Sequence, residues 1–185
     1  GDFPAFVLPD YAINSMWEFP AFFILGIVTA LVAAVFMRGL TVADKQRRSD
    51  EDSMPIWLLP ARGGLFVGLI AIFFPAVLGV GYEATSDALQ GSYGFWLLMA
   101  LVVAKIVATC ISLGSRFGGG VFSPSLFIGA MLGGAFGILA AIVAPELGSP
   151  SGVYAIVGMG AMASAVLGAP ISSTLIVFEI TGDYS

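Results

Sequence analysis

Histidine is absent from this chain of 185 residues, and cysteine occurs only once, at Cys110. The absence of histidine excludes histidine-based catalytic triads, histidine metal ligands and histidine proton relays. A single cysteine excludes an intrachain disulfide bond. The sequence also shows no nucleophile placed beside a base. These absences predict a protein that is not an enzyme, has no metal site and needs no cofactor.

Charged residues are also scarce. They make up 10% of the chain, against 58% for hydrophobic residues, whereas a soluble domain carries roughly 25% charged residues. Between Ala88 and Phe178 only Lys105, Arg116 and Glu146 are charged. The net charge is −5 and no basic stripe is present, so nucleic acid is not an expected partner. The composition predicts an all-α integral membrane protein whose surroundings are the lipid bilayer.

The long uncharged runs predict helices, because a membrane-spanning helix needs about 20 mostly apolar residues. The expected spans are Phe19–Met37, Gly63–Tyr82 with a kink at Pro75, and Tyr93–Leu113. Beyond residue 113 the apolar runs are cut by glycine, serine and proline, which favours shorter or broken helices. These are expected near 124–144, 152–167 and 170–181. Interrupted hydrophobic helices are typical of membrane proteins with a binding site at mid-depth.

Basic residues indicate an orientation in the membrane. Five of the seven lie in or beside the segment 41–55, namely Arg38, Lys45, Arg47, Arg48 and Arg62. The positive-inside rule therefore predicts that 41–55 is a cytoplasmic loop of a multi-pass protein. The next predicted loop, Gly81–Ser92, contains acidic residues and no basic residue, which fits the opposite side.

The segment 118–124, Gly-Gly-Gly-Val-Phe-Ser-Pro, is the most informative part of the sequence. Its glycines allow unusual backbone conformations and close approach to a ligand, and Ser123 and Pro124 suit the start of a helix. The first amides of a helix have no partner within it and lie at its positive end, so they attract anions. Such amides can bind a halide without a full positive charge, which would bind the ion too tightly for release. The alternative interpretation is a glycine hinge between two packed helices.

Two rows of small residues at fourfold spacing predict close helix packing. They are Gly129, Gly133 and Gly137, and then Gly160, Ser164 and Gly168. The segment 158–163 has the spacing of a dinucleotide-binding fingerprint, but that motif requires a soluble strand–turn–helix unit, so we reject it. Among the ionisable residues, Lys105 and Glu179 are expected to snorkel or to pair with a partner, and Glu146 is expected in a loop.

The run 114–130 resembles the G-x-F-x-P signature region of the CLC family of voltage-gated chloride channels and chloride/proton antiporters. Three further parts resemble the same family in the same order: 78–83, 158–161 with Ala169-Pro170, and 178–184. The likeness covers nearly the whole chain, from about Trp17 onward. An ordered set of motifs is far more specific than any single one.

The resemblance implies the CLC fold, with helices J to P of the second of two inverted repeats. Residues 1–185 would then be an incomplete part of one transmembrane domain. It also implies a homodimer with one anion pathway in each subunit. The residues around the central chloride would be Val121 and Phe122, through their backbone amides, and Gly119, Gly120, Ser123 and Pro124.

The segment 114–116 departs from the family pattern, since many members have Gly-Ser-Gly where this chain has Gly-Ser-Arg. Arg116 would add positive charge near the pathway and is a candidate modulator of rate or selectivity. The family's gating and proton-transfer glutamates belong to its first repeat, so this sequence does not separate a chloride channel from an antiporter. Two alternatives stay open: a broken-helix transporter for another anion, such as a carboxylate, and a membrane-embedded enzyme.

Overall fold

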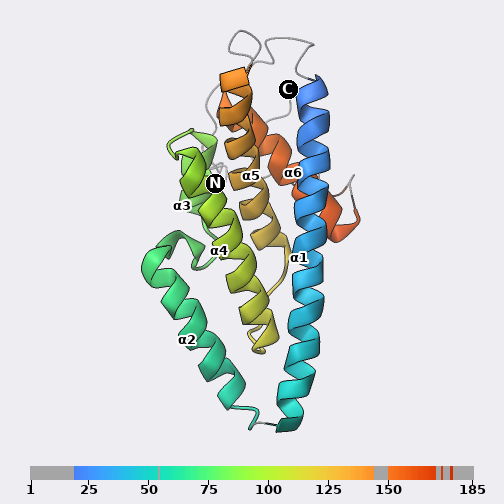
Figure 1. The fold of residues 1–185 in the computed structure, drawn as a ribbon, viewed down its shortest axis with the longest axis vertical. Coiled ribbons are helices and arrows are strands. Elements are labelled where there is room, and N and C mark those ends of the chain that lie inside the picture. The colour runs from blue at the N-terminus through green and yellow to red at the C-terminus, as the bar shows by residue number, and fades with distance from the viewer. Residues whose placement is uncertain (1–18, 54, 144–149, 170–171, 173–175, 177–185) are drawn as a thin grey trace, which may run out of the picture.

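The computed structural model describes residues 19–53, 55–143, 150–169, 172 and 176. Within these residues the regular structure is entirely helical, as expected. The elements are α1 (Phe19–Ser53), α2 (Leu58–Phe73), the short 3₁₀ helix η2 (Pro75–Val77), α3 (Tyr82–Leu89), α4 (Phe95–Gly114), α5 (Phe122–Val143) and α6 (Ser151–Leu167). Figure 1 shows them as an elongated bundle.

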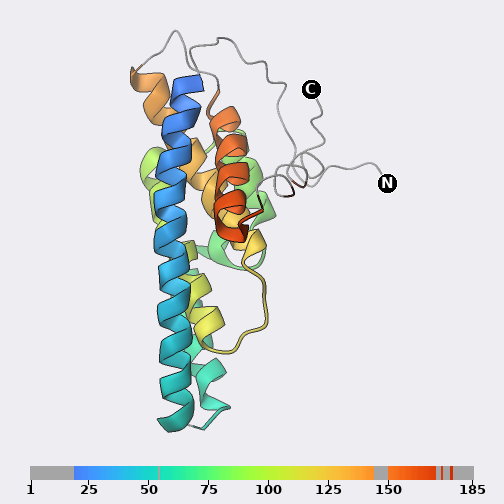
Figure 2. The same cartoon turned by 90° about the vertical axis from the view of Figure 1, so that its right-hand side faces the viewer.

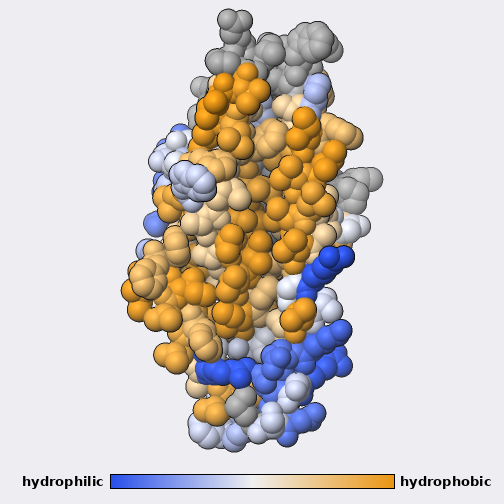
Figure 3. All heavy atoms as spheres, viewed as in Figure 1, coloured by the Kyte–Doolittle hydropathy of each residue, from blue (hydrophilic) through white to orange (hydrophobic). Residues whose placement is uncertain are grey.

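Three of the helices, α1, α4 and α5, are long and apolar enough to cross a membrane, while α2 and α6 are apolar but shorter. Apolar residues cover most of the face drawn in Figure 3, and hydrophilic residues gather at its lower end. Large side chains that would be unfavourable in water, such as Phe23, Leu65 and Trp96, are exposed. Such a surface fits a lipid environment and supports the predicted membrane class.

The central helix in the view of Figure 1 is α5, which packs most extensively against α6 and next against α4. Its residues from Ser125 to Ala135 are all buried. At the α5–α6 contact, Tyr154 of α6 is buried beside Phe22 and Phe136, with ring centroids 5.2 and 5.8 Å away. The buried part of α5 thus directly follows its first residues.

The first row of small residues has the predicted packing role. A Cβ atom added at Gly137 would lie 2.8 Å from Ser151 Cα, and one added at Gly129 or Gly133 would overlap the backbone of α6. The second row differs, because a Cβ at Gly160 or Gly168 meets nothing within 4 Å in the described structure. Gly168 instead ends α6, where its φ of 65° suits glycine.

The segment 41–55, predicted to be a loop, is helical as far as Ser53. Its charges form ion pairs at helical spacing: Arg47 contacts Asp44 and Glu51, both at 2.6 Å, and Arg48 contacts Asp44 at 3.0 Å. Pairs of opposite charge three or four residues apart stabilise a helix. The loop prediction is therefore wrong, since these charges extend α1 beyond its apolar part.

The predicted span Gly63–Tyr82 is also wrong in form. Its helix α2 ends at Phe73, and the chain breaks at Pro75 rather than kinking. Proline cannot donate to the preceding turn, and it restricts the residue before it. Gly79 and Gly81 then adopt positive φ of 61° and 78°. The predicted loop Gly81–Ser92 consequently contains the short helix α3.

The boundaries of the remaining helices agree closely with those predicted from the sequence. Helix α4 matches the predicted span Tyr93–Leu113, and α5 and α6 begin at Phe122 and Ser151, two residues and one residue before the predicted starts. Ser172 and Ile176 are helical, but most of the helix predicted at 170–181 lies outside the described residues, as do Glu146 and Glu179.

Candidate functional site

The chain is not helical between α4 and α5. Helix α4 ends at Gly114 and α5 begins at Phe122, and the connecting segment 115–121 bulges from the bundle in Figure 2. In Figure 1, α5 begins near mid-height of the molecule. A single helix running from Leu113 through Ala130 would have excluded a re-entrant helix. The structure contains no such continuous helix, because the chain is not helical between Gly114 and Phe122.

At the start of α5, three backbone amides have no acceptor among the residues that the structure describes. The carbonyl of Val121 accepts the first helical hydrogen bond, from Ser125 N at 3.1 Å, and a second from Ser125 Oγ at 2.6 Å. The amides of Val121, Phe122 and Ser123 precede this bond, and Pro124 has no N–H. None of the three has a hydrogen-bond acceptor among the described residues. They form a cluster of donors at the positive end of a 22-residue helix.

Ser123 does not have the predicted capping role. It lies inside the first turn of α5, and its hydroxyl donates at 3.5 Å to the carbonyl of Val80, in the segment between η2 and α3. The helix begins before Ser123, so the position that flanks the helix is Val121. Pro124 does lie in the first turn, as predicted.

Gly118, Gly119 and Gly120 are exposed, and their backbone conformation differs from the expectation. None of the three has a positive φ, and an added Cβ meets nothing within 4 Å at any of them. These positions therefore do not need glycine for an unusual conformation or for tight packing in the described structure. What glycine provides here is a bare backbone beside the free amides.

A cavity of roughly 170 Å³ lies beside this segment. One part of its wall is Gly118–Gly120 with Pro124, and another is Val77–Gly79 from the break between α2 and α3. Helix α4 contributes Lys105 and Thr109, among others. The cavity thus lies between the non-helical segments that precede α3 and α5.

Lys105 is buried in this wall, with 3% of its surface exposed. Its ammonium donates to the carbonyl oxygens of Val77 at 2.8 Å and Gly79 at 2.9 Å, and it lies 4.8 Å from the ring centroid of Phe127. The sequence predicted snorkelling or pairing. Pairing occurs, with backbone carbonyls, and snorkelling does not. The interaction with the cavity wall was not predicted, although a lysine inside an apolar helix was the signal for it.

Arg116 follows α4 directly and has a positive φ of 64°. Its guanidinium donates to Glu51 Oε1 at 2.7 Å, and the same oxygen accepts from Arg47 at 2.6 Å. The hydrogen bond to Glu51 raises the pKa of Arg116. The predicted positive charge is therefore paired with a carboxylate of α1. No local signal in the sequence indicated this contact.

These features define an all-helical membrane protein in which a break in the helical chain leaves helix-start amides next to residues that line a cavity. The chain matches the family model described as voltage gated chloride channel over residues 1–185. It belongs to this family, which confirms the resemblance of its motifs.

Curated relatives include a chloride channel protein, CLC-f, from Arabidopsis thaliana. It is 37% identical over an alignment of 193 residues, which includes 97% of this chain and 25% of that protein. The H(+)/Cl(-) exchange transporter ClcA of Salmonella typhi is 33% identical over 180 residues, covering 96% of this chain and 37% of the transporter. ClcA of Vibrio parahaemolyticus is 33% identical over 183 residues, covering 96% and 38%. The chain thus spans between a quarter and two fifths of these relatives.

Proposed function

We propose that this chain is part of a membrane protein that transports chloride, and that the backbone amides of Val121 and Phe122 hold the ion at the start of α5. Gly119, Gly120, Ser123 and Pro124 surround the bound ion. The observation that carries the proposal is the set of amides at the start of α5 that have no acceptor among the described residues. The residues on either side of them, Gly118–Gly120 and Pro124, line the cavity. An unsatisfied amide inside a membrane costs several kcal/mol, so an anion that accepts from these groups is stabilised.

The names of the relatives favour chloride as the anion. The Arabidopsis relative is named a chloride channel and the bacterial relatives are named H(+)/Cl(-) exchange transporters. Channel and exchanger both require an ion that binds and is released, which backbone amides permit. Proton coupling is the point on which the two named activities differ, and the described residues contain no group that we assign to it.

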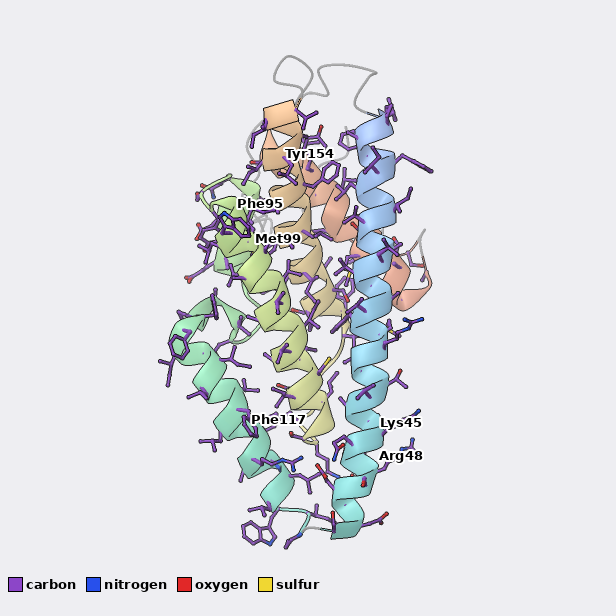
Figure 4. The ribbon with its side chains drawn as sticks, in the orientation of Figure 1. Lys45, Arg48, Phe95, Met99, Phe117 and Tyr154 are labelled. Atoms are coloured by element: carbon purple, nitrogen blue, oxygen red, sulfur yellow. The ribbon has the colours of Figure 1, made fainter. Side chains whose placement is uncertain are left out.

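The charges of α1 support an orientation. Lys45 and Arg48 project outward from the lower part of α1 in Figure 4, on the side where Figure 3 shows hydrophilic residues. We place this end, residues 41–53, on the cytoplasmic side, because basic residues beside a membrane span favour that side. The family resemblance further implies a homodimer with one anion pathway in each subunit and no enzymatic activity.

Replacing the Phe122 amide by an ester in the full-length protein tests the site. This change removes the N–H and keeps the side chain. A hydrogen bond to a charged group contributes about 1.5–3 kcal/mol, and 1.4 kcal/mol is about tenfold in affinity. Chloride affinity measured by calorimetric titration is therefore expected to fall at least about tenfold.

The matched control is Val121→Ile, which enlarges a side chain but keeps both amides. Its chloride affinity should stay within about twofold of the unmodified protein. An ester variant with unchanged affinity would place the site elsewhere. Flux from liposomes in chloride, nitrate or a carboxylate tests the substrate, since a preference for the carboxylate would favour the other broken-helix transporter.

A further inference from the structure

The segment 77–81, from the last residue of η2 to the residue before α3, is fixed to α4 and α5 at four points. The carbonyls of Val77 and Gly79 accept hydrogen bonds from Lys105. The carbonyl of Val80 accepts one from Ser123. At Gly81 the backbone lies so close to Phe127 that a Cβ would meet the ring carbon Cδ2 at 2.5 Å. This segment therefore lies against the first turns of the helix whose amides are free.

Lys105 makes two of these contacts from a position that is costly for a charged side chain. It is buried, and no carboxylate pairs with it among the described residues. A buried charge without compensation is strongly destabilising. Here two carbonyl dipoles and the face of the Phe127 ring provide the compensation. Removing Lys105 would leave two carbonyls inside the membrane without a partner.

We propose that Lys105 is a positioning residue of the anion site. It holds the segment 77–81 in place as the second wall of the cavity, opposite Gly118–Gly120, and thereby fixes the first turn of α5 through Ser123 and Phe127. This inference rests on the proposed function, because it assigns the cavity wall a role in anion binding. The role of Lys105 is exerted through the backbone it holds and not through contact with the ion.

The mechanical part of the proposal is tested without chloride, by hydrogen exchange on the full-length protein. The amides of Val77 and Leu78 donate within the break, to Phe74 O and Pro75 O. Lys105→Met keeps an unbranched apolar side chain of similar length and removes the ammonium, with its donors and its charge. Exchange of these two amides should become at least about tenfold faster in this variant, while the amides of α6 provide an internal reference. Unchanged exchange at Val77 and Leu78 would overturn the proposal.

Chloride titration of the same variants tests whether the wall matters for the anion. Lys105→Met should weaken chloride binding about tenfold or more, and Lys105→Arg should recover most of the loss because it keeps donors and charge. A faster exchange in Lys105→Met with full chloride affinity would overturn the assignment of the cavity wall. If the unmodified protein binds no chloride, the proposed function fails, whereas the exchange result still decides whether Lys105 holds the segment.

An ester at Val80 distinguishes a positioning role of Lys105 from an effect of its charge alone. It turns the Gly79 carbonyl into a weaker acceptor and leaves Lys105 unchanged, and the Val80 amide that it removes makes no backbone hydrogen bond among the described residues. This variant should exchange faster at Val77 and Leu78 and bind chloride more weakly. If the ester has no effect on either measurement while Lys105→Met weakens chloride binding, Lys105 acts by its charge alone and the positioning role is excluded.

Discussion

The contact between α5 and α6 offers a sharp test of how the first turn of α5 is held. Gly133 lies on the face of α5 that meets α6, and a Cβ added there would lie 2.8 Å from Ala155 Cα and would overlap the carbonyl of Tyr154. The obstructing atoms belong to the backbone of α6, so no side chain can rotate away. Gly133→Ala must therefore move the two helices apart.

The adjacent Gly134 provides the matched control. An added Cβ at Gly134 has Leu98 Cδ1 as its nearest neighbour, at 3.5 Å, which is an ordinary contact. In a helix interior alanine is favoured over glycine by about 1 kcal/mol, and this gain applies to both positions. At Gly133 it is outweighed, because overpacking a tight contact costs typically about 1–3 kcal/mol and more when the backbone must move. We expect the two variants to differ by about 2 kcal/mol or more.

The measurement is the midpoint of thermal unfolding of the full-length protein in detergent, compared among the unmodified protein and the two variants. Gly133→Ala should lower the midpoint, while Gly134→Ala should leave it unchanged or raise it. A Gly133→Ala midpoint at or above that of Gly134→Ala would refute the close helix crossing. Chloride affinity should fall in Gly133→Ala as well, since the free amides belong to the displaced helix.

Two further predictions concern the charged end of α1. In a variant with Cys110 replaced, a cysteine at Lys45 should react with a membrane-impermeant thiol reagent only from the cytoplasmic side, and labelling from the outer side would contradict the proposed orientation. A double-mutant cycle of Glu51→Gln and Arg116→Gln should give a coupling energy of no more than about 1 kcal/mol in unfolding, because both side chains are partly exposed. A coupling above 3 kcal/mol would mean that the pair is buried in the full protein.

The sequence predicted where the helical chain is interrupted better than it predicted the form of each interruption. Proline and glycine at 118–124 correctly placed the break before α5, since both residues restrict or release the backbone locally. Pro75 was placed in a kinked helix, although the chain breaks there. An isolated proline permits both outcomes in a membrane helix. In the structure the break occurs together with a contact from Lys105, 30 residues away, whose ammonium donates to the carbonyls of Val77 and Gly79.

The length of α1 shows a local signal that was misread. Between Asp44 and Asp52 the density of charge suggested a loop, yet the spacing of Asp44, Arg47, Arg48 and Glu51 is that of stabilising helical pairs. The contact between Glu51 and Arg116 had no such signal, because 65 residues separate them. Long-range pairs of this kind follow from the packing of the helices and are not encoded in any short motif.

The break before α3 and the break before α5 differ in which backbone groups they present, and this difference is consistent with the proposed anion site at only one of them. The break at 77–81 presents carbonyls, which need a cation, and the chain supplies one permanently in Lys105. The break before α5 presents amides, which suit an anion, and no carboxylate accepts from them among the described residues. A fixed carboxylate at the amides would occupy them permanently. Under the proposed function, a mobile anion accepts from these amides and is released again.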